Sequence, residues 1–388
     1  MTRPSLNIVV LGLSLSSSWG NGHATTYRAL ISALARRGHR VLFLERDVAW
    51  YAGHRDLENP PYCNLEFYSD LDGLTRYAAE IRSADAVIIG SFVPDGIAVI
   101  DWVLERAKGC VGFYDIDTPA TLGALRRQDC SYLSTSQIPR FELYLSFTGG
   151  PTLETLNRNW GATAPHALYC SADLNAYKPD ARREQRWHLG YLGTYSADRQ
   201  PTIEKFVIEI AERQPDKNFV VAGAQYPASI RWPRNVERIE HVPPSQHGEF
   251  YASLGWALNV TRADMRAAGY SPSVRLFEAA ACGTPIISDE WAGLGSFFQP
   301  DREIIVARNA EDVAAALNLP DTVRIRIGQC ARRRVVIEHT SDHRAEELES
   351  YLLASRTRRA VRHPTAEDSC RPFTRDSNID GEWNGKTL

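Results

Sequence analysis

Four short stretches of this sequence place polar side chains at points where a buried strand gives way to a helix. The first holds Gly20, Asn21, Gly22 and His23, directly before a helical pattern. A neutral imidazole there could take a proton from a hydroxyl group, and the positive end of the helix would help to keep it uncharged. A histidine that only caps the helix or packs beside it would give the same sequence, so both interpretations stay open.

The second stretch, FYDIDTPATL at 113–122, ends a strand with two carboxylates. Asp115 and Asp117 are two residues apart, so on a strand they would point the same way. They could bind sugar hydroxyls, hold a basic histidine or chelate a metal ion, and Asp117 or Thr118 could instead cap the next helix. No further cluster of carboxylates or histidines accompanies the pair, so we predict no metal site. His23, Asp115 and Asp117 are the candidate catalytic residues.

The third stretch is GYLGTYSADRQP at 190–201, which opens the second half of the chain much as the first loop opens the first half. Gly193 lets the backbone come close to a ligand, and Thr194 and Ser196 offer hydroxyl groups. Arg199 offers the planar, charged fork that suits a phosphate group. A surface loop with a solvated arginine is the alternative.

The fourth stretch, GYSPSVRLFEAAACGTPIIS at 269–288, carries two charges on a helix that is otherwise small and apolar. Ser271 and Ser273 flank a proline at a predicted helix start, where free N–H groups and a partial positive charge can hold a diphosphate. Arg275 and Glu278 are three residues apart and share a helix face. An exposed Arg–Glu pair is the alternative, but the apolar surroundings predict burial, and buried charges need a ligand or a partner.

Strand and helix patterns alternate along both halves of the chain, which predicts an α/β fold with two doubly wound parallel sheets facing a cleft. We predict a first domain at 1–170, a polar linker at 171–186 and a second domain at 187–340. A helix at 341–362 and a disordered tail at 363–388 should follow. Ligands of such sheets bind beyond the carboxyl ends of the strands, where the four stretches would lie.

Composition narrows the classes of partner. The 388 residues are 44% hydrophobic and 23% charged, with a net charge of −3, which is globular composition without a field that would attract nucleic acid. The seven cysteines are never closer than 20 residues and form no CxxC pair, so we expect neither zinc nor a disulfide framework and place the protein in a reducing cytoplasm. No apolar run approaches the ~20 residues of a membrane span.

The stretch FEAAACGTPIIS resembles the EA-x-A-x-G-x-P signature in the nucleotide-sugar-binding domain of group 1 glycosyltransferases with the GT-B fold. GYSPSVRLFEAAACG looks most like the CgeB-like branch of that group. LGTYSADR resembles the phosphate-binding loop of the same domain, and the NGH loop resembles the acceptor-side loop of the first domain. The resemblance in architecture covers roughly residues 5–350 and implies two Rossmann-like domains.

By this resemblance the chain transfers a sugar from a nucleoside diphosphate-sugar to a hydroxyl acceptor, with no cofactor and no bound metal. Glu278 would accept hydrogen bonds from the donor ribose, and the helix start with its serines would hold the diphosphate. The residues expected to bind the donor are Gly193, Thr194, Tyr195, Arg199, Arg262, Ser271, Ser273, Arg275 and Glu278. Gly20, Asn21 and Gly22 would form the acceptor-side loop.

Two features keep alternatives open. Many retaining members of the group carry a second glutamate eight residues before Glu278, and here that position is Tyr270, so the stereochemistry does not carry over. An epimerase or hydrolase of the same fold, or a non-catalytic sugar-nucleotide-binding protein, would share the donor site. A dinucleotide-dependent oxidoreductase is disfavoured because no GxGxxG follows the first strand, and Glu45 is only a loose match to a ribose-binding acid. The sequence does not identify the nucleotide base, the sugar, the acceptor or the oligomeric state.

Overall fold

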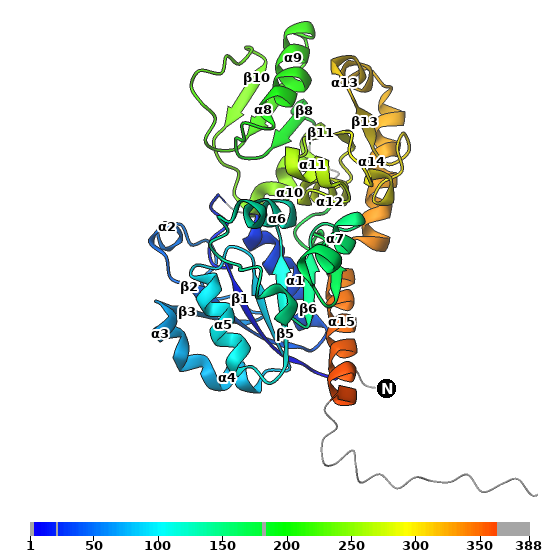
Figure 1. Ribbon diagram of the computed structural model, residues 1–388. Helices are drawn as coiled ribbons and strands as arrows, with labels where there is room; N and C mark the ends of the chain where they lie inside the picture. The colour runs from blue at the N-terminus through cyan, green and yellow to red at the C-terminus, as the bar shows by residue number, and fades with distance from the viewer. Residues whose placement is uncertain (1–3, 21, 181–183, 363–388) are drawn as a thin grey trace, which may run out of the picture.

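The computed structural model describes residues 4–20, 22–180 and 184–362 (Figure 1). Asn21 of the acceptor-side loop and the predicted disordered tail at 363–388 lie outside the described residues.

The first half of the chain forms a parallel sheet of seven strands in the order β3-β2-β1-β4-β5-β6-β7. Its strands are β1 (Asn7–Gly12), β2 (Arg40–Arg46), β3 (Asn64–Tyr68), β4 (Ala86–Gly90), β5 (Cys110–Asp115), β6 (Leu143–Ser146) and β7 (Pro165–Ala167). Its helices are α1 (His23–Arg36), α2 (Ala49–Ala52), α3 (Leu71–Leu74), α4 (Ala78–Ser83), α5 (Gly96–Arg106), α6 (Thr118–Arg127) and α7 (Pro151–Trp160). The central strands β1, β4 and β5 are apolar and buried along nearly their whole length, as expected for a parallel sheet covered on both faces.

The second half forms a parallel sheet of six strands in the order β10-β9-β8-β11-β12-β13. Its strands are β8 (Trp187–Leu192), β9 (Phe219–Ala222), β10 (Val236–Ile239), β11 (Leu254–Asn259), β12 (Ile286–Asp289) and β13 (Ile305–Ala307). Its helices are α8 (Gln200–Ile203), α9 (Glu209–Arg213), α10 (Pro244–Ala252), α11 (Ala263–Ala268), α12 (Val274–Ala281), α13 (Ala310–Leu317) and α14 (Asp321–Glu338). A π-helical turn at Glu204–Ile208 joins α8 to α9.

The two sheets therefore form the predicted pair of doubly wound domains. One apolar cluster runs from the α1 face of the first sheet, through Cys170 and Ala172, to α12 and α14 of the second domain. Separate clusters fill the opposite face of each sheet.

The last described helix, α15 (Ser341–Arg362), returns to the first domain and runs beside α1 (Figure 1). Arg36 donates to Asp342 at 2.8 Å, and Arg37 donates to the buried Glu349 at 2.7 Å. The chain thus crosses between the domains twice, and the two crossings lie side by side because Ala172 and Thr340 pair in a β-bridge.

Candidate active site

The carboxyl ends of the two sheets face each other, so the loops that follow their strands meet at the domain boundary. The backbone N–H of Gly149, after β6, donates to the carbonyl of Tyr270, before α12, at 2.9 Å. Helix α11 of the second domain also contacts α6 of the first, and the two lie close together in Figure 1. This is where the structure gathers most of the predicted site residues.

His23 and Asp117 form a dyad on the first domain. His23 is the first residue of α1 and is buried, and its Nε2 lies 2.9 Å from Asp117 Oδ2, at the start of α6. The Asp117 side chain keeps 38% of its surface exposed, so the carboxylate is the open side of the pair. Burial alone would raise the pKa of Asp117, but the hydrogen bond and charge of His23, with the charge of Arg262, outweigh it and hold that pKa below its usual value. The carboxylate therefore stays ionised beside the imidazole.

Asp115 does not join this dyad. It is completely buried, and its two carboxylate oxygens accept hydrogen bonds from Thr121 Oγ1 at 2.6 Å and Tyr144 Oη at 2.7 Å. Burial raises the pKa of Asp115 to about 6, the nearby Asp117 adds to the rise, and the two hydrogen bonds oppose it. The expectation that both carboxylates present themselves together is not met, because the chain leaves the strand at Asp115 and Asp117 already lies in the turn into α6.

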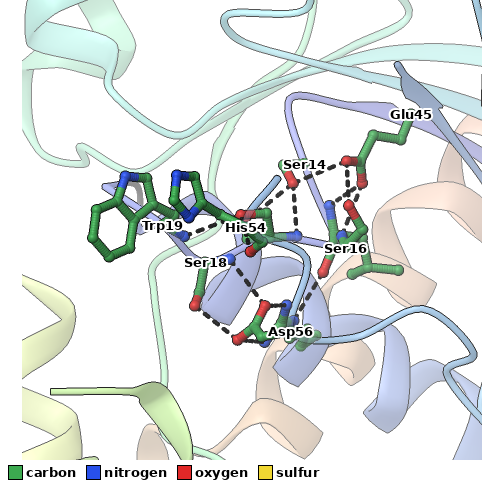
Figure 2. Close-up of polar contacts among 10 residues, drawn as sticks. Ser14, Ser16, Ser18, Trp19, Glu45, His54 and Asp56 are labelled. Carbon is green, nitrogen blue, oxygen red and sulfur yellow. Dashed lines mark hydrogen bonds and ion pairs between the residues drawn. The ribbon is translucent and has the colours of Figure 1, made fainter. Parts of the chain in front are cut away.

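The serine-rich loop after β1 is fixed by two carboxylates (Figure 2). Glu45, at the end of β2, is fully buried and accepts hydrogen bonds from Leu15 N at 2.6 Å, Ser16 N at 2.8 Å and Ser16 Oγ at 2.6 Å. Asp56 accepts from Ser18 Oγ at 2.8 Å. Because these bonds occupy both oxygens of the buried Glu45 carboxylate, Glu45 cannot serve as the ribose-binding acid of a dinucleotide site.

The same loop reaches the second domain through an aromatic residue. The indole of Trp19 stacks on the His54 ring (Figure 2), with their centroids 4.5 Å apart, and the Trp19 centroid lies 5.0 Å from that of His241 in the second domain. Gly20 follows with φ +67° and Gly22 immediately precedes α1. Through Trp19, the loop that precedes His23 therefore contacts the second domain.

Two guanidinium groups lie close together at the predicted phosphate loop of the second domain: that of Arg199, from the loop, and that of Arg275, from α12. Arg275 Nε donates to the Leu192 carbonyl at 2.6 Å, and its Nη1 donates to Asn259 Oδ1 at 3.0 Å. Arg199 Nη2 donates to the Thr194 carbonyl at 2.7 Å. Within the described part of the chain, neither arginine has a carboxylate within ion-pair distance. Burial lowers the pKa of Arg199, and the positive charges of Arg275 and Arg262 lower it further.

Unsatisfied polar atoms surround the same place. The Tyr191 hydroxyl and Arg199 Nε are buried without a hydrogen-bond partner. The Arg275 guanidinium lies over the Tyr191 ring, 4.7 Å from its centroid. A Cβ atom on Gly193 would lie 2.7 Å from the Tyr191 hydroxyl and 2.8 Å from Arg275 Nη2, so only glycine leaves this space open. Tyr195, next along the loop, packs its ring against Tyr226 at 5.5 Å.

Helix α12 points its amino terminus at this group of arginines. Ser273 precedes the helix and gives no side-chain cap to its N–H groups, and its hydroxyl accepts from Arg275 Nη1 at 3.3 Å. The first N–H groups of α12 are therefore left for an anion. Arg262 is exposed and lies where its charge acts on Asp117 of the first domain as well as on Asp198 and Arg199 of the second.

Ser271 has a different partner from the predicted diphosphate. Its hydroxyl is buried and lies 2.9 Å from Thr148 Oγ1 of the first domain. The neighbouring Tyr270 has φ +46°, and its ring lies where a Cβ on Gly150 or on Gly293 would stand. In this arrangement, residues 270–271 join the domains.

Glu278 is buried, and both of its carboxylate oxygens already accept hydrogen bonds. Tyr177 Oη, from the linker, donates to Oε1 at 2.7 Å, and Tyr251 Oη, from α10, donates to Oε2 at 3.2 Å. Arg275 and Glu278 therefore do not pair with each other: Arg275 reaches the ends of β8 and β11, and Glu278 reaches α10 and the linker. A ribose contact at Glu278 stays a prediction.

Sequence reasoning missed several residues that complete the site, namely Tyr191, Asn259, Tyr177 and Tyr251, and it did not connect Glu45 with the serine-rich loop. Tyr191 and Asn259 lie near the ends of β8 and β11, and a search for polar residues near strand ends beside Arg275 could have found them. The two tyrosines that donate to Glu278 are distant from it in sequence, and no motif marks them as its partners.

Comparison with solved structures establishes the architecture. The chain resembles a sucrose-phosphate synthase from Thermosynechococcus elongatus with a TM-score of 0.65 and 14% identity, covering 92% of this chain and 100% of that one. It resembles Anabaena HepE in complex with UDP and glucose with a TM-score of 0.68 and 12% identity, covering 90% and 100%. It resembles an alpha-glucosyltransferase in complex with UDP with a TM-score of 0.67 and 14% identity, covering 90% and 100%. At these identities the likeness defines the GT-B fold.

The sequence of the second domain defines the class of protein. Residues 199–350 match the family described as glycosyl transferase-like. The chain is thus a glycosyltransferase with the GT-B fold, an enzyme that moves a sugar from a nucleotide-sugar. No curated protein matches it by sequence. The CgeB-like branch stays a prediction, because the matching family is described only as glycosyl transferase-like.

Proposed function

We propose that the start of α12, with Arg199, Arg275 and Arg262, binds the diphosphate of the nucleotide-sugar and stabilises it as it leaves. The observation that carries this proposal is the pair of neighbouring guanidinium groups, Arg199 and Arg275, with no acidic partner among the described residues. Cations that repel one another in the free protein are stabilised by an anion between them. The open space at Gly193 and the uncapped N–H groups of α12 lie at the same place.

The reaction breaks the bond between the anomeric carbon and a diphosphate oxygen and forms one to the acceptor oxygen, through an oxocarbenium-like transition state. The leaving diphosphate gains negative charge as the bond stretches, so the arginines stabilise the transition state more than the bound donor. The acceptor hydroxyl must lose its proton. We assign this proton to the His23–Asp117 dyad, whose exposed carboxylate can accept the hydroxyl's hydrogen bond.

Asp115 has a supporting role in this scheme. Its buried carboxylate ties the end of β5 to β6 and α6 through Tyr144 and Thr121, and so fixes the turn that presents Asp117.

We propose UDP as the first nucleotide to test, because HepE and the alpha-glucosyltransferase were solved with it. Thermal shift of the full chain should compare UDP, GDP, dTDP, ADP and NAD. A nucleotide at a hundredfold excess over its Kd adds about 2.7 kcal/mol of stability. Stabilisation by one nucleoside diphosphate that disappears in Arg275→Met supports the assignment. Stabilisation by NAD alone, or by none, would overturn it.

Because guanidinium groups neutralise the leaving group in this proposal, we expect transfer to survive EDTA. Among the described residues, no group of three or more His, Cys, Asp or Glu side chains could hold a metal ion. Loss of activity with EDTA, restored by magnesium, would contradict metal-independent transfer. A hydrolase or epimerase would consume the donor without needing the acceptor, so transfer is measured with and without an acceptor.

We keep a hydroxyl acceptor that is not nucleic acid, and a cytoplasmic location, as proposals. The net charge of −3 supports the first, and the six described cysteines, all free thiols, suit the second. In the described part of the chain, no helix combines the length and apolar character of a membrane span.

A further inference from the structure

Phe92 follows β4 and breaks two rules of local structure at once. Its backbone has φ +62°, a left-handed conformation that is rare and strained for a bulky residue. The residue is 39% exposed, although Ser91 and Val93 on either side are buried. A strained backbone that exposes a large apolar ring is disfavoured for folding, so a functional role is the natural explanation.

The turn that carries Phe92 is held firmly in this conformation. Ser91 N donates to the Tyr114 carbonyl at 3.0 Å, and Ser91 Oγ accepts from Ile116 N at 3.1 Å, so the turn is bonded to the end of β5. On its other side, Asp95 also has positive φ and pairs with Arg46 at 2.8 Å. The ring position is therefore built into the domain.

The ring lies beside the proposed catalytic dyad. Its centroid is 5.7 Å from that of His23, at 84°, and 4.5 Å from that of Tyr132, at 37°. His23 is in turn bonded to Asp117. The exposed part of the ring thus borders the place where, by the proposed function, the acceptor hydroxyl loses its proton.

We propose that Phe92 is the platform on which the acceptor stacks, and that the acceptor is a saccharide. This inference rests on the proposed function and adds the substrate class. A pyranose has an apolar C–H face that packs on an aromatic ring and an edge of hydroxyl groups. With its face on Phe92, a sugar ring turns one hydroxyl toward Asp117, which a flexible alkyl alcohol would not do.

The charge of the chain favours a neutral sugar over a nucleobase as the stacking ring. A nucleic-acid acceptor brings phosphates that need a basic surface, whereas the chain has a net charge of −3. The charged groups around Phe92 are the ion pair of Arg46 with Asp95 in the same turn and the Asp117 carboxylate bonded to His23, with Arg262 acting on Asp117 from the second domain. Because the proposed function assigns Arg262 to the donor diphosphate, the groups left for the acceptor suit hydroxyls better than phosphates.

The test uses the full chain with UDP-glucose as donor and a panel of acceptors: methyl glucoside, cellobiose, maltose, hexanol and a single-stranded oligonucleotide. If UDP-glucose is inactive, the sugar-nucleotide of the base that stabilises the chain replaces it. We expect a saccharide to be the acceptor used, and Phe92→Ala to raise its KM about tenfold or more with kcat and donor KM changed less than about twofold. Phe92→Trp should keep the acceptor KM within about threefold of wild type.

A second variant separates stacking from folding. Phe92→Gly removes both the ring and the strain, so it should unfold no earlier than wild type and yet show the same raised acceptor KM. Ile337→Ala, an exposed apolar truncation on α14, is the control and should leave both KM values unchanged.

The outcomes distinguish the two proposals. If the wild type neither binds a nucleoside diphosphate nor consumes a nucleotide-sugar, the proposed function fails and the platform with it. If the donor is used and Phe92→Ala leaves the acceptor KM unchanged, or if only hexanol or the oligonucleotide is glycosylated, the saccharide platform alone is refuted.

Discussion

Thr148 and Ser271 join the two domains through hydroxyl groups 2.9 Å apart, immediately before the chain enters α12. Either hydroxyl can be the donor of this bond, and Ser271 keeps its own O–H for a diphosphate only when Thr148 donates. The contact therefore connects the approach of the two domains with the donor site. We expect Thr148→Ala and Ser271→Ala to weaken UDP binding equally, and the double variant to be no worse than either, with a coupling of about 1 kcal/mol. Calorimetric titration of the four proteins measures it. A larger loss in Ser271→Ala alone would restore the direct diphosphate contact.

Arg199 should contribute little to folding, because its unpartnered Nε and the repulsion by neighbouring cations offset its bond to the Thr194 carbonyl. Its Nε has no partner and neighbouring charges repel it, so Arg199→Met should weaken UDP binding about 10- to 100-fold while leaving the melting temperature unchanged or higher. Affinity for uridine should not change. Arg308→Met, which removes an exposed partner of Glu290, is the control. Equal losses for UDP and uridine would mean that Arg199 does not contact the phosphates.

Arg275 should contribute more to stability than Arg199, because it donates to both the Leu192 carbonyl and Asn259 Oδ1, whereas Arg199 donates to the Thr194 carbonyl. Arg275→Met leaves the Leu192 carbonyl and the Asn259 amide oxygen without their donors, so it should cost about 1–3 kcal/mol of unfolding free energy in addition to UDP affinity. Urea denaturation of the two arginine variants side by side measures this contrast. Equal stability of the two would show that these bonds are exchanged for water at no cost.

Glu278 offers a test between a structural and a ligand-binding role. Glu278→Gln leaves one of the two tyrosine hydroxyls without an acceptor and should cost about 1–3 kcal/mol, part of which Tyr251→Phe should restore in the double variant. If Glu278 also binds the ribose, wild type should bind UDP more tightly than 2′-deoxy-UDP or 3′-deoxy-UDP, and the substitution should remove the difference. Unchanged discrimination would leave Glu278 with the tyrosines alone.

Asp115 gives the chain a pH signature with a definite sign. Its pKa is about 6 when folded, against an ordinary value of 3.8, so the folded state binds this proton more tightly. Stability from this group falls as the pH rises from about 4 to about 6, and above that a penalty of roughly 3 kcal/mol persists. Asp115→Asn lacks this dependence, so the stability of wild type minus variant should fall across that window in urea titrations. Asp117, with a lowered pKa, acts in the opposite direction but is common to both proteins. A difference that does not vary with pH would contradict the raised pKa.

The alternating patterns predicted the two parallel sheets because buried strands in α/β folds are continuous apolar runs that stand out from amphipathic helices. The edge strands β3 and β7 were not predicted, because edge strands are short and only half-buried. Helix α14 was missed as well. Its sequence, DTVRIRIGQCARRRVVIE, alternates arginine with apolar residues and shows little helical periodicity.

The sequence was sufficient to predict which loop residues lie near one another where the order of strands alone brings them together. His23, Asp117, Arg199 and Arg275 follow strands at the facing edges of the two sheets, so topology was sufficient. The partners of Ser271, Glu278 and Asp115 could not be predicted, since Thr148, Tyr177 and Tyr144 reach them only through tertiary packing. Phe92 escaped notice because backbone strain leaves no mark in the sequence.

The paired crossings at Ala172 and Thr340 have a mechanical consequence. A single connection would allow the domains to rotate freely relative to each other. Two adjacent connections joined by a β-bridge instead act as a hinge axis. We expect the bridge to limit relative motion of the domains to a rotation about this line, with the largest displacements at the residues farthest from it. One hinge rotation would then control access to the donor site and the acceptor site together.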